Sequence, residues 1–208
     1  MLHKALMPRQ KRIFQNNFPY HVTRRTNNRD WFSIPINEVW DLVKESLKYA
    51  QDNAPTKIHA FVLMSNHYHL LVSTPKCNLH HFMMYFNRRF SRELNRRAKR
   101  ENHCFANEYK ATIVNDQRYL ETVYRYIYQN PIRAGLTEDI HSYPYSSLHF
   151  SSYEAKQFNF EPHFHFAKEK AFGEKRYCAE MENIIKSGLR RGEFKLSEKN
   201  KRLVHRYL

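Results

Sequence analysis

The sequence predicts an α+β fold of the ferredoxin-like (RRM-like) class, a βαββαβ antiparallel sheet with helices on one face. Three observations predict this class. Four runs of strand length are rich in alternating, β-branched or aromatic residues. Amphipathic helical patterns separate the first run from the second and the third from the fourth. The second and third runs lie only two residues apart, which is typical of a hairpin.

The first half of this order is predicted from local patterns. Residues 18–23 alternate and become β-branched toward their end, which indicates the first strand. A basic polar loop follows over residues 24–30. The first helix is predicted over residues 36–49 because apolar side chains recur there at helical spacing, at Ile36, Val39, Trp40, Val43 and Leu47. Residues 57–64 indicate the second strand.

The second half adds two strands and two helices. The third strand is predicted over residues 67–73 and the fourth over residues 109–114. Between them, residues 79–100 predict a long helix with one apolar stripe and otherwise mostly basic sides. An added tyrosine-bearing helix is predicted over residues 117–130. It should close at Asn130, because a residue that precedes a proline is biased out of the helical region.

The domain organisation follows from where these patterns weaken. With 208 residues, the chain can form one domain with an extension. We expect residues 1–150 to form that domain and residues 151–208 to be a basic, aromatic-rich C-terminal extension. Within the extension only residues 174–192 have a helical pattern, and the tail after them is basic.

Charge is the strongest compositional feature. The chain has 35 Lys and Arg against 20 Asp and Glu, a formal net charge of +15. Such an excess favours polyanionic partners, because each neutralised phosphate releases condensed counterions. The 14 tyrosines and 15 phenylalanines are interleaved with these charges and favour single-stranded nucleic acid, whose bases stack on aromatic rings.

Membrane and disulfide-rich classes are disfavoured. No apolar run approaches the roughly 18 residues of a spanning helix, and the N-terminus lacks the apolar stretch of a signal peptide. We therefore expect a cytoplasmic protein with no membrane partner. Cys77, Cys104 and Cys178 are far apart and form no CxxC pair, which indicates reduced thiols rather than a zinc ribbon or a disulfide framework.

A pair of histidines is the first candidate site. His67 and His69 are two residues apart on the predicted third strand, so both imidazoles should project from one face of the sheet. Tyr68 and Leu70 should then face the helix-covered core. Two imidazoles on one sheet face can hold a metal ion and leave coordination positions open. By itself a His-x-His pair is weak evidence, since solvated or hydrogen-bonded histidines are commoner.

The added helix provides the second candidate pair. Tyr126 and Asn130 are four residues apart, which places them on one helical face, one turn apart. A tyrosine hydroxyl can attack phosphorus, and an amide oxygen can bind a hard cation. If this helix met the open sheet face, Asn130 and the two histidines could surround one cation with Tyr126 beside it.

These segments resemble a known family. Residues 64–72, MSNHYHLLV, are similar to the histidine–hydrophobic–histidine motif of the HUH endonuclease superfamily. Within it, the chain resembles the REP-associated tyrosine transposases and their single-tyrosine insertion-sequence relatives. The resemblance covers roughly residues 8–150 and includes four further segments: residues 20–25, 109–110, 126–136 and 143–147. The segment that begins at Tyr126 is the most specific, because it fixes which tyrosine matches the family's nucleophile.

The resemblance implies a role for each candidate residue. His67 and His69 match the metal-ligand histidines, Asn130 matches the third ligand, and Tyr126 matches the nucleophile. The implied activity is that of a sequence-specific single-stranded DNA transposase. Tyrosine attack on a phosphodiester would give a 5′-phosphotyrosine intermediate and a free 3′-OH, followed by strand transfer. Mg²⁺ or Mn²⁺ is the expected cofactor, and single-stranded or hairpin DNA is the expected partner.

The chain departs from the family's pattern at two places. Thr26, Asn27 and Asn28 stand in the first loop, where the family often has glycine. Asparagine tolerates left-handed backbone angles, so the turn should survive. The middle residue of the histidine motif is Tyr68 rather than an aliphatic residue, and it remains compatible with a half-buried strand.

Several alternatives stay open at this point. Tyr128 is a second candidate nucleophile, and His163 and His165 form a second His-x-His without a strand pattern after it. A non-catalytic nucleic-acid binding module would share the fold and the charge, whereas a zinc hydrolase lacks an obvious glutamate. The protein could be a monomer or a homodimer, with the tyrosine serving its own or a partner's metal. Candidate DNA contacts are Arg24, Arg25, Arg88, Arg92, Arg96 and Arg133.

Overall fold

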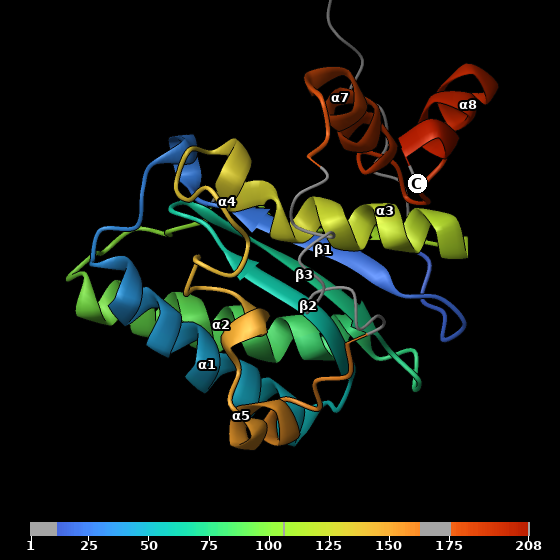
Figure 1. The fold of residues 1–208 in the computed structure, drawn as a ribbon. Coiled ribbons are helices and arrows are strands. Elements are labelled where there is room, and N and C mark those ends of the chain that lie inside the picture. Colours follow the sequence, from blue (N-terminus) through green and yellow to red (C-terminus); the bar gives the residue numbers. More distant parts are fainter. Residues whose placement is uncertain (1–11, 106, 163–175, 208) are drawn as a thin grey trace, which may run out of the picture.

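A computed structural model describes residues 12–105, 107–162 and 176–207 (Figure 1). The strands are β1 (Tyr20–Arg25), β2 (Lys57–Leu63), β3 (His67–Ser73) and β4 (Lys110–Ile113). The helices are α1 (Ile36–Asn53), α2 (Leu79–Arg97), α3 (Gln117–Tyr128), α4 (Asn130–Arg133), α5 (Ser152–Gln157), α7 (Ala179–Gly188) and α8 (Glu198–Tyr207). Short 3-10 turns lie at Asn27–Arg29 and Ser147–His149.

The four strands form one sheet in the order β2-β3-β1-β4, with every neighbouring pair antiparallel. This order and the βαββαβ succession confirm the predicted ferredoxin-like class. The predicted third strand agrees with β3 residue for residue, and the other strands differ from prediction by one or two residues at their ends. β1 and β3 lie at the centre, so side chains on their faces are covered most completely.

Helices cover both faces of this sheet, as Figure 1 shows. α1 and α2 pack on one face, where Tyr68 and Leu70 of β3 enter the core. α3 packs on the other face against a second apolar cluster that contains Leu71. Because strand side chains alternate, His67 and His69 lie on the α3 face. The added helix therefore covers the face that a ferredoxin-like sheet leaves open, as the site hypothesis required.

The end of α3 differs from the prediction. The helix was expected to run to Asn130 and close there, but α3 ends at Tyr128 and α4 continues with Pro131 in its first turn. Proline is tolerated at that position, where its missing N–H needs no partner. The Asn130 amide Nδ2 donates to the carbonyls of Tyr126 at 2.8 Å and Ile127 at 3.3 Å. The asparagine side chain thus satisfies the carbonyls exposed by the break.

The loop after β1 has the left-handed backbone expected of its asparagines. Asn28 has a φ of 52° and Arg29 a φ of 65°. The Thr26 amide donates to the Asn66 carbonyl at 2.9 Å, which ties this loop to the turn between β2 and β3. The turn that glycine often makes in the family therefore forms here without it.

The described segments beyond residue 150, residues 151–162 and 176–207, pack against the sheet and its helices. Phe158 joins the core on the α1 and α2 face, whereas Met181 and Ile185 of α7 join the cluster around α3. The Ile113 amide donates to the Gly192 carbonyl, and the Phe194 amide donates back to the Ile113 carbonyl, at 2.9 and 2.8 Å. The basic tail, for which no element was predicted, forms α8.

His163 and His165, the second His-x-His pair, lie outside the described residues. Within the described ranges, none of the helices combines the length and the apolar character that a membrane span requires.

Candidate active site and metal centre

His67 and His69 form the centre of a buried polar cluster beneath α3. Their rings are 5.0 Å apart between centroids and nearly perpendicular. Both side chains are buried, with 9% and 5% of their surface exposed. Alternation along β3 places them side by side, and the long apolar runs of β2 and β3 bury that part of the sheet on both faces.

The hydrogen bonds of His67 define its protonation. The Asn66 Nδ2 group donates to the Arg29 carbonyl, so Asn66 Oδ1 faces His67 Nδ1 as an acceptor at 2.7 Å. His67 Nδ1 therefore carries the proton, and Nε2 accepts from the Arg25 guanidinium at 3.1 Å. Burial, then the charges of Arg25 and Arg133, lower the pKa of His67 to about 3. The neutral imidazole thus directs its Nε2 lone pair away from Asn66.

His21 is a site residue that the sequence did not single out. Its Nε2 lies 2.9 Å from His69 Nδ1, and the two rings stack at 5.2 Å. Burial lowers the pKa of His21 to about 3 and that of His69 well below its usual value. Both rings are neutral, so one nitrogen of the pair donates and the other accepts. A proton on His69 Nδ1 would leave the His69 Nε2 lone pair free to bind a cation.

Tyr126 lies directly against these histidines. Its ring is 5.8 Å from that of His69 and 6.3 Å from that of His21, perpendicular or nearly so to both. The Arg133 guanidinium carbon sits 4.3 Å from the ring centroid. The Tyr126 hydroxyl makes no hydrogen bond with any residue of the described ranges. One chain therefore brings the tyrosine to its own histidine pair.

Tyr128 occupies a different environment on the same helix. Its hydroxyl lies 2.7 Å from Ser147 Oγ and its ring packs on that of Tyr124 at 5.1 Å. Burial raises the pKa of Tyr128 well above its usual value. Two residues on a helix are separated by about 200° around the axis, which directs Tyr128 away from the histidines.

Asn130 and Arg133 close the cluster from α4. The Arg133 Nη2 group donates to Asn130 Oδ1 at 2.8 Å, and Arg133 Nε lies 3.0 Å from a Glu182 carboxylate oxygen on α7. Asn130 is itself buried, with 4% of its surface exposed. The extension of the chain thus contributes a carboxylate to the surroundings of the site, which the sequence pattern did not indicate.

The donor set at this cluster fits a divalent cation. His69 Nε2 is buried and has no hydrogen-bond partner in the described part of the chain. His67 Nε2 and Asn130 Oδ1 are both acceptors, each satisfied here by an arginine. Neutral imidazoles and an amide oxygen suit Mn²⁺ or Mg²⁺. Among residues of the described ranges, no three His, Cys, Asp or Glu side chains group as a metal site, so a metal centre here depends on the Asn130 amide as the third donor.

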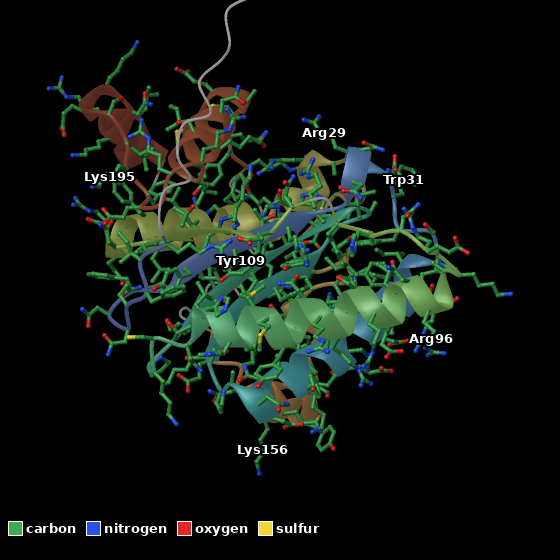
Figure 2. The ribbon with its side chains drawn as sticks, turned by 180° about the vertical axis from the view of Figure 1, so that it is seen from behind. Arg29, Trp31, Arg96, Tyr109, Lys156 and Lys195 are labelled. Atoms are coloured by element: carbon green, nitrogen blue, oxygen red, sulfur yellow. The ribbon has the colours of Figure 1, made fainter. Side chains whose placement is uncertain are left out.

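The structure divides the six candidate DNA-contacting arginines. Arg25 and Arg133 lie at the histidine cluster. Arg24 lies on the opposite sheet face, where its guanidinium sits 4.6 Å from the Phe105 ring centroid and donates to the Asn107 carbonyl. The other three, Arg88, Arg92 and Arg96, form an exposed stripe of α2 on that same side. Figure 2 labels Arg96.

Comparison with known proteins identifies the family. The family model described as "Transposase IS200 like" matches residues 14–130, more than half of the chain. The chain belongs to this transposase family. The match spans the histidine pair, Tyr126 and Asn130, so all four candidate residues lie within the part of the chain that the family model covers. The predicted resemblance is thereby confirmed.

Two relatives of this transposase are informative. A Haemophilus influenzae protein named as a REP-associated tyrosine transposase is 26% identical over 141 residues, which are 62% of this chain and 78% of the relative. The solved structure of a REP-associated tyrosine transposase bound to a REP hairpin covers 83% of this chain and all of its own, at 15% identity and a TM-score of 0.59. That structural likeness confirms the fold of the transposase.

Proposed function

We propose that this transposase cleaves and rejoins single-stranded DNA through Tyr126, at a sequence beside a hairpin. The contact of the Tyr126 ring with the buried His69 ring, within one chain, is the observation that carries the proposal. The buried and unpaired His69 Nε2 supports it, because such a nitrogen is costly unless it binds something. A non-catalytic binding module would have no use for this arrangement.

The proposed step exchanges one phosphoester bond for another. The Tyr126 oxygen forms a bond to phosphorus, and the bond from phosphorus to the 3′-oxygen breaks. The tyrosine proton passes to solvent or a basic group, and the leaving 3′-oxygen takes up a proton. The product is a 5′-phosphotyrosine with a free 3′-OH, and attack by a 3′-OH reverses the step without added energy.

The residues around Tyr126 have separate roles in this step. Mg²⁺ or Mn²⁺ held by His67, His69 and Asn130 would polarise the scissile phosphate. Arg25 and Arg133 stand on two sides of the cluster and would bind the non-bridging phosphate oxygens. The exposed α2 stripe of Arg88, Arg92 and Arg96 would contact phosphates farther along the strand, as would Arg24.

The hairpin is proposed from the relative of similar fold, which is bound to one. Single-stranded DNA beside the hairpin is required because the scissile phosphate must reach a buried tyrosine. The experiment is incubation of the protein with labelled hairpin DNA and Mn²⁺ or Mg²⁺, followed by a denaturing gel. A covalent adduct of protein and DNA supports the proposal, and its absence with both metals and several single-stranded flanks overturns it.

His21 should act as a positioning residue for this centre. Replacing His21 with alanine removes the group that fixes His69 Nδ1, and loss of such a partner typically weakens metal binding about 10- to 100-fold. His21→Gln keeps an acceptor at that place and should retain most of the affinity. Mn²⁺ binding followed by electron paramagnetic resonance, without DNA, measures both variants. Equal Mn²⁺ affinity for folded His21→Ala and the unaltered protein would contradict this role.

A further inference from the structure

The outer edge of the sheet carries a groove that the proposed chemistry does not use. It has a volume of about 1080 Å³ and lies between β4, the segment that precedes β1, and the chain that follows α7. Figure 2 shows this side, with Tyr109 near its middle and Lys195 toward α7 and α8. Thr112 of β4 pairs with His21 of β1, so the groove lies one strand outward from His21 and two strands outward from His67 and His69 of β3.

The groove is basic, and its acids are already paired. Two carboxylates line it: Glu108 lies 2.6 Å from Arg12, and Glu193 lies 2.8 Å from Lys195. The remaining charges are three exposed cations that have no ion pair with any described residue: Lys110, Arg190 and Arg191. An anionic ligand would therefore meet three cations without displacing any existing pair.

The floor of the groove offers backbone groups as well. The Tyr109 carbonyl accepts from Arg12, and the Ile113 amide and carbonyl bond to Gly192 and Phe194. Strand alternation directs the Ala111 amide to the same outer side, midway between them. No hydrogen bond outside the sheet occupies the Ala111 backbone among the described residues. An amide donor thus shares the groove with Lys110, Arg190 and Arg191, a combination suited to phosphate.

We propose that this groove at the edge of β4 binds the phosphate backbone of the DNA hairpin stem, apart from the nucleotide that is cleaved. This inference rests on the proposed function for its choice of DNA. Two strand spacings of about 4.8 Å separate β3 from β4, which places the groove roughly 10 Å beyond His69. At about 3.4 Å per base pair, a duplex leading away from the site reaches it within one helical turn.

The charge of the groove argues against the other occupants of an open strand edge. A second copy of the chain would bring its own three unpaired cations against these, and like charges so placed repel. A neutral extended peptide could pair with Ala111, but it would leave Lys110, Arg190 and Arg191 without counter-charges. Only a polyanion uses both the backbone and the cations.

The test is hairpin binding by the double variant Arg190→Glu/Arg191→Glu. Binding at about 0.1 M salt should weaken at least about tenfold. In Arg190→Ala/Arg191→Ala, the slope of log affinity against log salt should fall by about 2, one unit for each lost phosphate contact. Lys48→Glu/Lys156→Glu is the matched control, since it changes the net charge equally on α1 and α5. Figure 2 shows Lys156 at the far end of the molecule from Lys195.

Covalent adduct formation on a short unpaired oligonucleotide is measured in parallel. If the adduct forms but the groove variants bind the hairpin as tightly as the unaltered protein, the proposal that the groove binds the hairpin stem is wrong. The proposed chemistry is then unaffected. Weakened hairpin binding without any adduct supports the groove and overturns the chemistry. Equal losses in the groove and control variants would show a non-specific charge effect and overturn the groove. If the groove variants change the oligomeric state and leave the DNA affinity unchanged, the groove binds a second copy of the chain and the proposal is wrong.

Discussion

Replacing Tyr126 with phenylalanine is expected to abolish the covalent adduct and to lower strand cleavage by more than about 10³-fold. Phenylalanine keeps the ring contacts with His69 and Arg133 and lacks only the attacking oxygen. The fold and the DNA affinity should therefore change little. The measurements are the adduct yield on a denaturing gel and hairpin binding by fluorescence anisotropy.

Tyr128→Phe is the matched control for this variant, since it removes a hydroxyl from the same helix. Tyr128 is bonded to Ser147 instead of facing the histidines, so the change should cost about 1 kcal/mol of stability and leave the adduct intact. Full adduct formation by Tyr126→Phe, or its loss only in Tyr128→Phe, would remove Tyr126 from the proposed reaction.

His67→Ala should have the second largest effect, a fall in cleavage of about 10³-fold or more, because metal assistance is worth several kcal/mol. The residual activity should no longer respond to a chelator, and Mn²⁺ binding should weaken in the absence of DNA. Hairpin affinity should be retained, because Arg25 and Arg133 stay in place. Titration with EDTA and calorimetry with Mn²⁺ measure these effects.

His59→Ala provides the control for a lost buried histidine. His59 lies on β2 and bonds to Ser73 and to the Glu161 carbonyl, so its loss should affect stability and leave metal binding unchanged. If His67→Ala kept the chelator sensitivity of the unaltered protein, the assignment of the metal to His67 would be wrong.

The sequence predicted where most of the candidate residues lie, because the signals that place them are local. Alternation along one strand was enough to place His67 and His69 together and Tyr68 on the other face. The four-residue spacing of Tyr126 and Asn130 survived the break between α3 and α4, since the Asn130 side chain itself bridges that break. Both patterns depend on contacts within a few residues.

The parts that the sequence missed depend on long-range pairing. His21 reaches His69 only because β1 pairs with β3, 48 residues away along the chain. Glu182 meets Arg133 through the packing of α7 on α3, and no spacing pattern encodes that contact. Long-range packing also explains why only two of the six candidate DNA-contacting arginines lie at the histidine cluster. Composition shows how many cations a chain has, but the face that each occupies follows from the fold.

The contact between Tyr126 and the histidines of its own chain has a genetic consequence. In the proposed function, every copy carries its own set of reacting groups, so two defective alleles should not complement one another. Cells that express Tyr126→Phe together with His67→Ala should remain inactive, whereas an active site shared between chains would regain activity in the mixed pair. For the same reason, an excess of Tyr126→Phe should inhibit the unaltered protein only by occupying the target DNA. This inhibition should disappear as more target DNA is supplied.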